Sequence, residues 1–270
     1  MKTPSLLASA ALLGSLSLMA FTGCGTGSGP NTTSRVRLFD ALVGGPAGGI
    51  SIVQRGMALN ASALAYGTAA PSSVNAYYTV VSGGSSITGS GVNTDVYAWP
   101  SVSGAALAPE QSFLLSPNTA GQNNGTYTIA AAGITGSTTT PPVLYRFIDN
   151  APALTSTLNV VALRVINLAP DTAGTTGLSL DNNNQPVLGL SNIAYGDPAS
   201  SASYIQIPIL NGIPFQFSIT YGSANQKVNT QTPLSNIALV SGHSYTLFLI
   251  GEVNPVNGAP GLDYVLTTDN

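Results

Sequence analysis

Short apolar runs separated by turn-forming residues make up the chain from residue 35 onward. The runs are rich in Val, Ile, Tyr and Phe, and Gly, Pro and Asn stand between them. This pattern predicts β-strands, and no stretch after residue 34 shows a sustained helical period with caps. The predicted strands are 35–41, 49–54, 74–81, 94–99, 111–116, 125–132 and 142–148, then 160–168, 177–181, 202–209, 214–221, 236–240, 243–251 and 262–267.

An internal repeat relates these two sets of strands. RVRLFDALVGGPAGGISIV aligns with RVINLAPDTAGTTGLSL, and ALAYGTAAPSSVNAYYTV aligns with NIAYGDPASSASYIQIPI. In this alignment Arg35 to Arg164 and Tyr66 to Tyr195 share one spacing of 129 residues. Further on, GTYTIA matches HSYTLF, and the copies end alike in YRFIDN and YVLTTDN. A fixed spacing of similar segments indicates two copies of one unit.

Each copy, at about 110 residues, is large enough to bury a core without disulfides or metal. Seven short strands with turn residues between them predict a β-sandwich. The expected fold class is all-β, with two tandem Ig-like or transthyretin-like antiparallel sandwiches, repeat 1 at 35–150 and repeat 2 at 159–270. Because only residues 151–158 link them, an end-to-end arrangement is expected.

The second copy resembles the domain-of-unknown-function 4397 family. The motifs are the strand, Ala-Pro-Asp turn and strand of RVINLAPDTAGTTGLSL, then AYGDPASSASYIQIPI and GHSYTLFLIG, and they cover most of residues 160–270. In the first copy Ala41-Leu42-Val43 replaces the Ala-Pro-Asp turn, so its membership follows from the repeat. The resemblance implies a β-sandwich in a secreted or lipid-anchored bacterial surface protein, and it implies no catalytic residues.

Charge is scarce in this chain. Charged residues make up 6% of it and the net charge is −3, whereas 44% is apolar, so the chain is expected to fold rather than to be disordered. The basic residues beyond the N-terminal segment are scattered, and no basic patch for nucleic acid forms. These residues are Arg35, Arg37, Arg55, Arg146, Arg164 and Lys227.

The N-terminus has the pattern of an export signal. Lys2 precedes an apolar run of 16 residues from Leu6 to Phe21. At about 1.5 Å per residue this run reaches roughly 24 Å, short of the ~30 Å hydrocarbon core of a membrane. A cleaved signal peptide is therefore expected rather than a permanent transmembrane helix.

The end of that segment, Phe21-Thr22-Gly23-Cys24, resembles the lipobox of bacterial lipoproteins. The resemblance implies cleavage of a signal peptide at 1–23 and acylation of Cys24, the only cysteine. Residues 24–34 would then form a flexible tether. Gly25, in place of the Asp that marks inner-membrane retention, points to the outer membrane if the cell has two membranes. An ordinary signal peptide with an incidental cysteine is the alternative.

No catalytic or metal-binding constellation is expected, and no cofactor is implied. His243 is the only histidine and is expected at a strand edge on the surface. The segment DNNNQP, from Asp181, has alternating oxygen side chains but lacks the Gly and Glu of an EF-hand loop, so a hairpin turn is the better interpretation. A looser calcium site using Asp171, Asp181 or Asp197 is an open alternative, as is an enzyme that uses such carboxylates.

Two aromatic residues are the candidate ligand-binding residues. Tyr97 and Trp99 are two positions apart in a predicted strand, so their side chains share a face about 7 Å apart. Two rings at this spacing suit a sugar, although a sandwich core is the more frequent environment. The corresponding strand of the second copy carries Phe215, Phe217, Ile219 and Tyr221 on one face, as a core strand does.

The sequence therefore predicts a non-catalytic surface lipoprotein of the cell envelope, held by an N-terminal lipid, with a structural, adhesive or macromolecule-binding role. Envelope proteins, glycans or further copies of the chain are the expected partners. Self-association is expected because charge is the usual protection of exposed strand edges. A glycan-binding module that uses Tyr97 and Trp99 is the alternative function.

Overall fold

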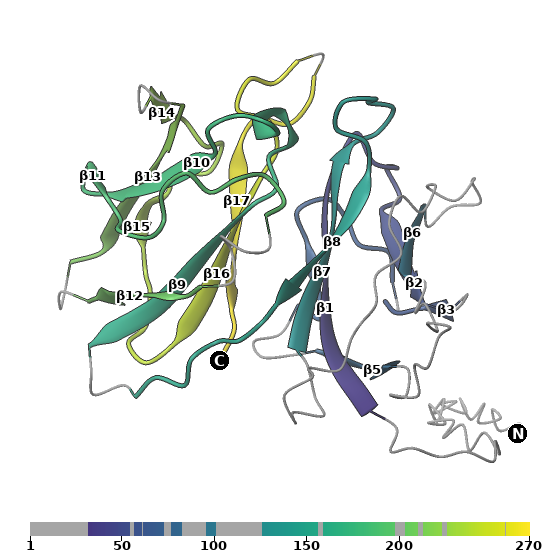
Figure 1. Ribbon diagram of the computed structural model, residues 1–270, viewed down its shortest axis with the longest axis horizontal. Coiled ribbons are helices and arrows are strands. Elements are labelled where there is room, and N and C mark those ends of the chain that lie inside the picture. The colour runs from purple at the N-terminus through teal and green to yellow at the C-terminus, as the bar shows by residue number, and fades with distance from the viewer. Residues whose placement is uncertain are drawn as a thin grey trace, which may run out of the picture.

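The computed structural model describes residues 32–54, 57–60, 62–72, 77–82, 96–100, 126–155, 159–197, 203–209, 213–222, 226–256 and 258–270. Figure 1 shows two groups of strands, an N-terminal half (β1–β8) and a C-terminal half (β9–β17). Among the described residues there is no helix long and apolar enough to cross a membrane.

Within the described residues the regular structure is β-strand apart from one 3-10 turn, η2 (Pro170–Thr172). The strands of the N-terminal half are β1 (Thr32–Val43), β2 (Ile50–Gln54), β3 (Met57–Ala58), β4 (Ala69–Ala70), β5 (Tyr78–Ser82), β6 (Val96–Pro100), β7 (Thr126–Ile134) and β8 (Val143–Ile148). Those of the C-terminal half are β9 (Val160–Asn167), β10 (Leu178–Asn182), β11 (Gln185–Pro186), β12 (Ile205–Pro208), β13 (Phe215–Tyr221), β14 (Gln226–Val228), β15 (Ser235–Ile237), β16 (Ser244–Ile250) and β17 (Asp263–Thr268).

The all-β prediction is confirmed, and the longer strands lie close to the predicted positions. The predicted strand 111–116 lies outside the described residues. β1 begins at Thr32, so the last three residues of the expected tether, 32–34, belong to a strand instead. The short strands β3, β4, β11 and β14 were not predicted, because two or three residues carry too little pattern.

The strands of the two halves pair in the same order. One sheet has the order β4-β1-β7-β8, with β5 also on β1, and its counterpart has the order β12-β9-β16-β17. A second sheet in each half is built around β3-β2-β6 and β11-β10-β13-β14, with β15 also on β13. This common pairing supports the internal repeat. The structure is β-sandwich-like in each half.

The prediction of purely antiparallel sheets was wrong for the two central strand pairs. β1 and β7 are parallel, and so are β9 and β16. Parallel strands usually occur where both faces of a sheet are covered, and both of these sheets are covered. β16, for example, is buried at all of its positions, and β9 at all but its first.

Alternate residues of these central strands enter different cores. In β9, Leu163 and Val165 face a core inside the C-terminal half, whereas Ile166 belongs to a separate cluster. In β1, Leu38 faces a core inside the N-terminal half, whereas Phe39 belongs to that same separate cluster. The unbroken apolar runs of β1 and β9 therefore reflect burial on both faces.

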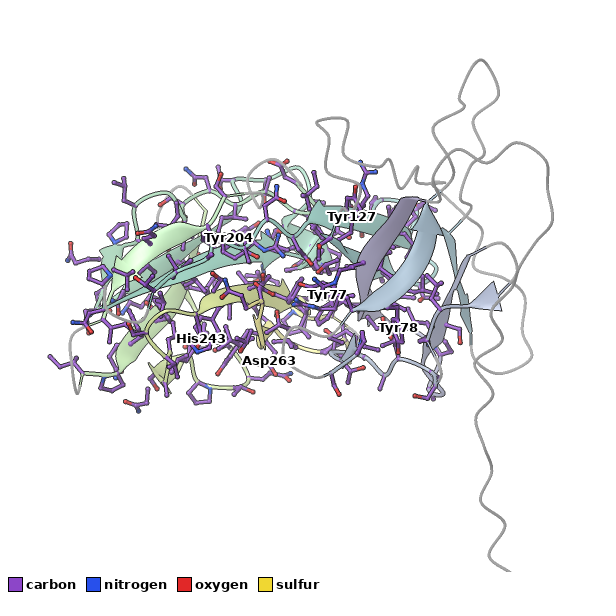
Figure 2. All side chains as sticks on the ribbon, turned by 90° about the horizontal axis from the view of Figure 1, so that it is seen from below. Tyr77, Tyr78, Tyr127, Tyr204, His243 and Asp263 are labelled. Carbon is purple, nitrogen blue, oxygen red and sulfur yellow. The ribbon has the colours of Figure 1, made fainter. Side chains whose placement is uncertain are left out.

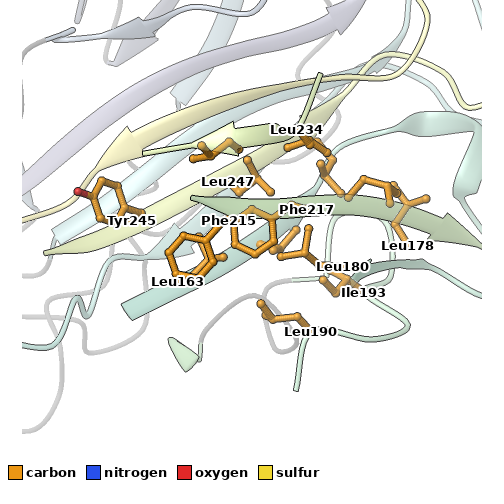
Figure 3. Close-up of a cluster of buried hydrophobic side chains, with 14 of the residues drawn as sticks. Leu163, Leu178, Leu180, Leu190, Ile193, Phe215, Phe217, Leu234, Tyr245 and Leu247 are labelled. Carbon is orange, nitrogen blue, oxygen red and sulfur yellow. The ribbon is translucent and has the colours of Figure 1, made fainter. Parts of the chain in front are cut away.

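The core of the C-terminal half lies between its two sheets (Figure 3). Phe215, Phe217 and Ile219 of β13 all face it, and the two Phe rings stack at 5.1 Å between centroids. The expectation that this strand lines a sandwich core is confirmed.

The third cluster joins the two halves. It contains Phe39, Ala41, Ala130, Ala132 and Phe147 from the N-terminal half, and Ile166, Leu168, Phe248 and Ile250 from the C-terminal half. The rings of Phe39 and Phe248 stack across it, with centroids 4.4 Å apart. We call this contact between sheet β4-β1-β7-β8 and sheet β12-β9-β16-β17 the junction.

The expected end-to-end arrangement was wrong, because the halves pack through faces of their sheets. A short link limits how far two units can separate but not which surfaces meet. Both halves carry an apolar outer sheet face, and burying these faces against each other removes them from water.

Candidate functional site

Two of the predicted features lie outside the described residues. These are Cys24 and the apolar segment that precedes it. The lipid anchor therefore stays a prediction from the sequence.

Tyr97 and Trp99 lie in β6, which pairs antiparallel with β2. In this register Trp99 is opposite Ser51 and Tyr97 is opposite Val53, whereas Ala98 is opposite Ile52. Ile52 is fully buried in the N-terminal core. Ala98, and not Tyr97 or Trp99, is therefore the β6 position opposite Ile52.

His243 lies at the entry to β16 and is half-buried (Figure 2). Its Nδ1 is 2.6 Å from the main-chain oxygen of Asn270, within hydrogen-bond distance. Its ring also lies 6.3 Å from that of Tyr245, between centroids.

The candidate calcium aspartates serve local structure where their contacts are defined. Asp171 accepts hydrogen bonds from the backbone N–H groups of Val253 and Asn254, and so holds the β16–β17 loop against η2. Within the described residues no three His, Cys, Asp or Glu side chains are grouped as a metal site.

The DNNNQP segment forms the β10–β11 hairpin. Its loop residues Asn183 and Asn184 have φ angles of 51° and 60°. Two consecutive residues with positive φ are typical of a type I′ turn. The hairpin interpretation of this segment is confirmed.

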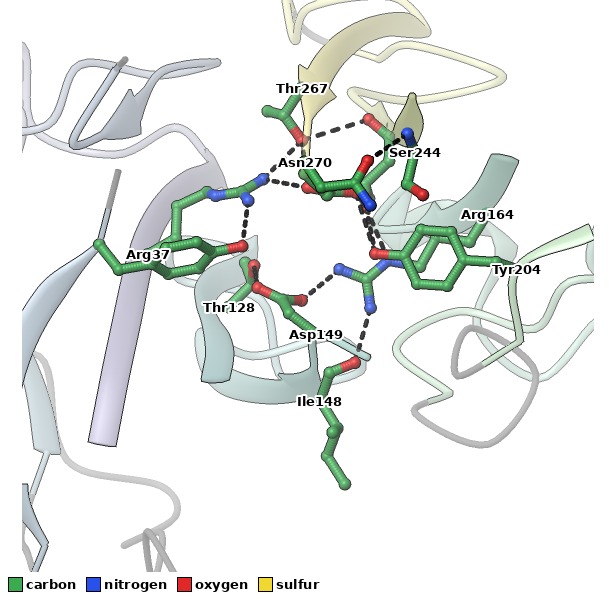
Figure 4. Close-up of polar contacts among 12 residues, drawn as sticks. Arg37, Thr128, Ile148, Asp149, Arg164, Tyr204, Ser244, Thr267 and Asn270 are labelled. Atoms are coloured by element: carbon green, nitrogen blue, oxygen red, sulfur yellow. Dashed lines mark hydrogen bonds and ion pairs between the residues drawn. The ribbon is translucent and has the colours of Figure 1, made fainter. Parts of the chain in front are cut away.

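The main polar constellation was not predicted as a unit and lies at the junction (Figure 4). Arg37, on β1, donates two hydrogen bonds to the C-terminal half. One goes to Thr267 Oγ1, in β17, at 2.6 Å, and the other to Asp269 Oδ1, just after β17, at 2.7 Å. Its other terminal nitrogen donates to the Tyr77 hydroxyl at 2.6 Å. The side chains of Arg37 and Asp269 are 4% and 0% exposed, so this ion pair is removed from water.

A second ion pair runs in the opposite direction. Arg164, on β9, pairs with Asp149, which follows β8 in the N-terminal half. It also donates to the carbonyl oxygen of Ile148 at 2.8 Å and to Thr246 Oγ1 at 2.6 Å. Tyr204 places its ring 4.9 Å from the Arg164 guanidinium carbon. The side chains of Arg164 and Asp149 are also buried.

The two ion pairs are related by the repeat. Tyr77 and Tyr204 are each next to the arginine of their own half, at centroid distances of 4.9 Å in both halves. Figure 2 labels both tyrosines. Thr128 donates to Asp149 at 2.8 Å, and Thr246 donates to Asp269. Each half therefore supplies the same arginine, tyrosine, threonine and aspartate, and each arginine reaches the aspartate of the other half.

This geometry corrects the alignment of the repeat. Arg37 is opposite Thr128 in the parallel β1·β7 pair, as Arg164 is opposite Thr246 in β9·β16. Arg37, not the exposed Arg35, is therefore the counterpart of Arg164, at a spacing of 127 residues. The matching DN ends of the two copies were the signal that could have identified both aspartates.

The charges of this cluster stabilise one another. Burial alone would lower the pKa of Arg37, but the nearby charges of Asp269 and Asp149 outweigh burial and raise it. The pKa of Arg164 is raised in the same way, chiefly by Asp149. Burial raises the pKa of the Tyr77 hydroxyl to about 12. Around neutral pH both arginines are therefore cations and Tyr77 is neutral.

The repeated Tyr-Gly dipeptides also contact the opposite half. Gly196 packs against the ring of Tyr145, and a Cβ at this glycine would overlap that ring. A Cβ at Gly67 would lie 3.3 Å from Ile250 Cδ1. Both glycines have positive φ, 64° and 72°, which adds to the requirement for glycine. The motif therefore marks the junction.

One buried acid differs between the halves. Asp40 is 2% exposed, and its Oδ1 accepts the N–H of Leu42 at 2.9 Å. Asn167 is at the same place in the C-terminal half, accepting the N–H of Ala169 and donating to the Ile193 carbonyl oxygen. Burial raises the pKa of Asp40 to about 7, although the Leu42 hydrogen bond opposes it.

A cavity of about 440 Å³ lies at one end of the junction. The β1–β2 turn, the β7–β8 turn and the β16–β17 loop line it, from Val43, Ile134 and Ser137 to Glu252 and Pro260. Its size suits a small molecule. Glu252 is the one ionisable residue among the lining residues and accepts the N–H of Val256. Among the described lining residues no second ionisable side chain stands beside Glu252.

No family model matches the chain, and no curated protein matches it either.

Removing one partner of the buried Asp149–Arg164 pair is expected to destabilise the protein strongly. Asp149→Asn leaves the Arg164 charge buried without its partner, and such a change costs about 3–5 kcal/mol. The measurement is the free energy of unfolding from urea titrations.

Two further variants control this measurement. The double variant Asp149→Asn/Arg164→Met removes both charges and is expected to recover part of the loss. Lys227→Met changes an exposed contact to Asn184 and is expected to stay within about 0.5 kcal/mol of the original protein. A loss below about 1 kcal/mol in Asp149→Asn would contradict the structural role of this pair.

The raised pKa of Asp40 predicts that the stability of the protein depends on pH. Its pKa rises from an ordinary 3.8 to about 7 on folding, so the folded protein binds this proton more tightly than the unfolded chain. The contribution of Asp40 is therefore most favourable below about pH 4 and is lost as the pH rises to about 7, by on the order of 4 kcal/mol. Asp40→Asn should abolish this loss, so it stabilises the protein at pH 8 relative to the original and not at pH 4.

The reverse substitution at the equivalent position is the matched control. Asn167→Asp places a carboxylate in the corresponding buried site and is expected to destabilise the protein increasingly from pH 4 to pH 8. Parallel stability profiles for Asp40→Asn and the original protein would show that Asp40 is an ordinary carboxylate.

Proposed function

We propose that the chain is a non-catalytic lipoprotein of the bacterial cell envelope. Two tandem β-sandwich modules, 35–150 and 159–270, pack on each other through the junction and serve a structural, adhesive or macromolecule-binding role. The observation that carries this proposal is the junction, where two buried ion pairs each join an arginine of one half to an aspartate of the other. The resemblance of the second copy to the domain-of-unknown-function 4397 family supports the same role.

The proposed tether is short enough to keep the folded part of the chain close to a membrane. Acylation would fix Cys24, and β1 begins at Thr32, so seven residues separate the anchor from the folded body. At 5–6 Å times the square root of length, this tether has a typical reach of roughly 15 Å. The body would then stay near the headgroups. Gly25 after the cysteine supports the outer membrane in a cell with two membranes.

Replacing the cysteine tests the anchor. Cys24→Ser removes the only thiol, and the protein is expected to lose its acyl chains and to leave the membrane fraction for the soluble envelope fraction. Ser28→Ala changes the same tether and should keep the protein in the membrane fraction. Fractionation and intact-mass spectrometry of the native protein measure both effects. Unmodified Cys24 in the native protein would remove the lipid from the proposal.

Glycan binding by Tyr97 and Trp99 is a second candidate, supported by the register of β6. That register alternates both residues with Ala98, which is opposite the buried Ile52. Two aromatic residues at alternate positions of one strand would suit a sugar.

The only tryptophan of the chain reports on this second candidate. Titration with envelope oligosaccharides is expected to change the fluorescence of Trp99, and Tyr97→Ala should weaken that response by tenfold or more, about 1.4 kcal/mol. Tyr221→Ala, in the C-terminal half, is the control. Fluorescence that does not respond to any sugar contradicts glycan binding here.

A further inference from the structure

The junction has the symmetry of a contact between two identical molecules. Arg37 pairs with Asp269 and Arg164 with Asp149, so each half gives one cation and one anion to the other. Such mutual exchange defines an isologous interface, in which one surface is complementary to itself. In this chain the two copies of the surface are covalently linked.

The apolar contacts follow the same symmetry. Phe39 of β1 stacks on Phe248 of β16, and the equivalent strands supply Ile166 and Ala130 to the same cluster. Gly196 of the C-terminal half packs against Tyr145. Gly67 of the N-terminal half lies near Val265, which occupies the position equivalent to Tyr145, since Tyr145 is opposite Ala130 and Val265 is opposite Phe248. Polar and apolar contacts therefore both occur twice, in opposite directions.

A half that leaves the junction needs a replacement partner. Opening would strand four buried charged side chains, and each unpaired buried charge is expensive. It would also expose the apolar cluster around Phe39 and Phe248 to water. The N-terminal half of one chain and the C-terminal half of another can restore every one of these contacts. Exchange between two chains therefore conserves the contact energy of the junction.

The connection between the halves is long enough for this exchange. β8 ends at Ile148 and β9 begins at Val160. Asp149 belongs to the junction, so the connection proper is the ten residues 150–159, which reach roughly 33–36 Å when extended, about three times the ~10 Å between packed sheets. Two side chains of the C-terminal half hold this connection at the Pro152 carbonyl oxygen. Ser244 Oγ donates to it at 3.0 Å and Asn270 Nδ2 at 2.6 Å.

We propose that the junction is a self-recognition surface through which the chain pairs with a second copy of itself by exchanging halves. The partner is an identical chain, and the two chains form a closed dimer with two copies of the junction. This proposal names a partner for the structural role proposed above. Anchoring in one membrane would favour the exchange by raising the local concentration of chains.

Complementary charge reversals test the exchange in solution. The chain from residue 24 onward retains every described residue and carries Cys24→Ser in all samples, so the assay is independent of the lipid. Arg37→Asp and Asp269→Arg are each introduced alone. In each single variant, positions 37 and 269 carry charges of the same sign. These like charges meet in the monomer, and they meet in both junctions of an exchanged dimer of that variant.

The mixture of these two variants behaves differently if halves exchange. In a mixed dimer Asp at position 37 of one chain meets Arg at position 269 of the other, and the remaining junction keeps the original Arg37–Asp269 pair. After joint refolding, native mass spectrometry is expected to show mixed dimers in more than tenfold excess over dimers of either variant. Each relieved like-charge contact that is worth 1.4 kcal/mol contributes a factor of ten.

Two controls make the result decisive. The double variant Arg37→Asp/Asp269→Arg restores the pair within one chain and should refold without needing a partner. Original chains with light and heavy nitrogen, refolded together at high concentration, should form dimers of intermediate mass. The proposal is overturned if the charge-reversed mixture gives no mixed dimer while the double variant folds, or, where the double variant fails to fold, if the original chains give only monomers.

Discussion

Two arginine–aspartate pairs buried between the halves constrain the whole structure. A charge removed from water is tolerated only beside a partner of opposite sign, and here each partner belongs to the other half. Neither half can therefore satisfy its own buried charges without the other. The hydroxyls of Tyr77, Thr128 and Tyr204 complete the hydrogen bonding around these charges.

This constraint explains the composition of the central strands. β1, β7, β9 and β16 are each packed between an inner core and the junction, and so are buried on both faces. Their alternate positions serve two different cores. Strands of this kind have a nearly unbroken apolar sequence. Two of their few charged residues, Arg37 and Arg164, pair with an aspartate of the opposite half.

The two halves share one framework but not identical side chains. Phe39 and Phe248 fill one side of the junction, while Ile166 and Ala130 contribute at the equivalent positions. Asp40 and Asn167 occupy the same buried turn, one as an acid with a raised pKa and the other as an amide. Fusion of two copies allows such differences, because each side of a covalent pair can change independently.

The sequence by itself determined the all-β class, the positions of most strands, the repeat and the inward face of Phe215, Phe217 and Ile219. Those features follow from the alternation of apolar and polar residues and from turn-forming residues, and both patterns are visible within short segments of the sequence. The tertiary structure decided the parallel central pairs, the face-to-face packing and the pairing of Arg37 with Asp269. The physical reason is distance along the chain. Arg37 and Asp269 are 232 positions apart, and no local sequence pattern indicates which carboxylate a buried arginine pairs with.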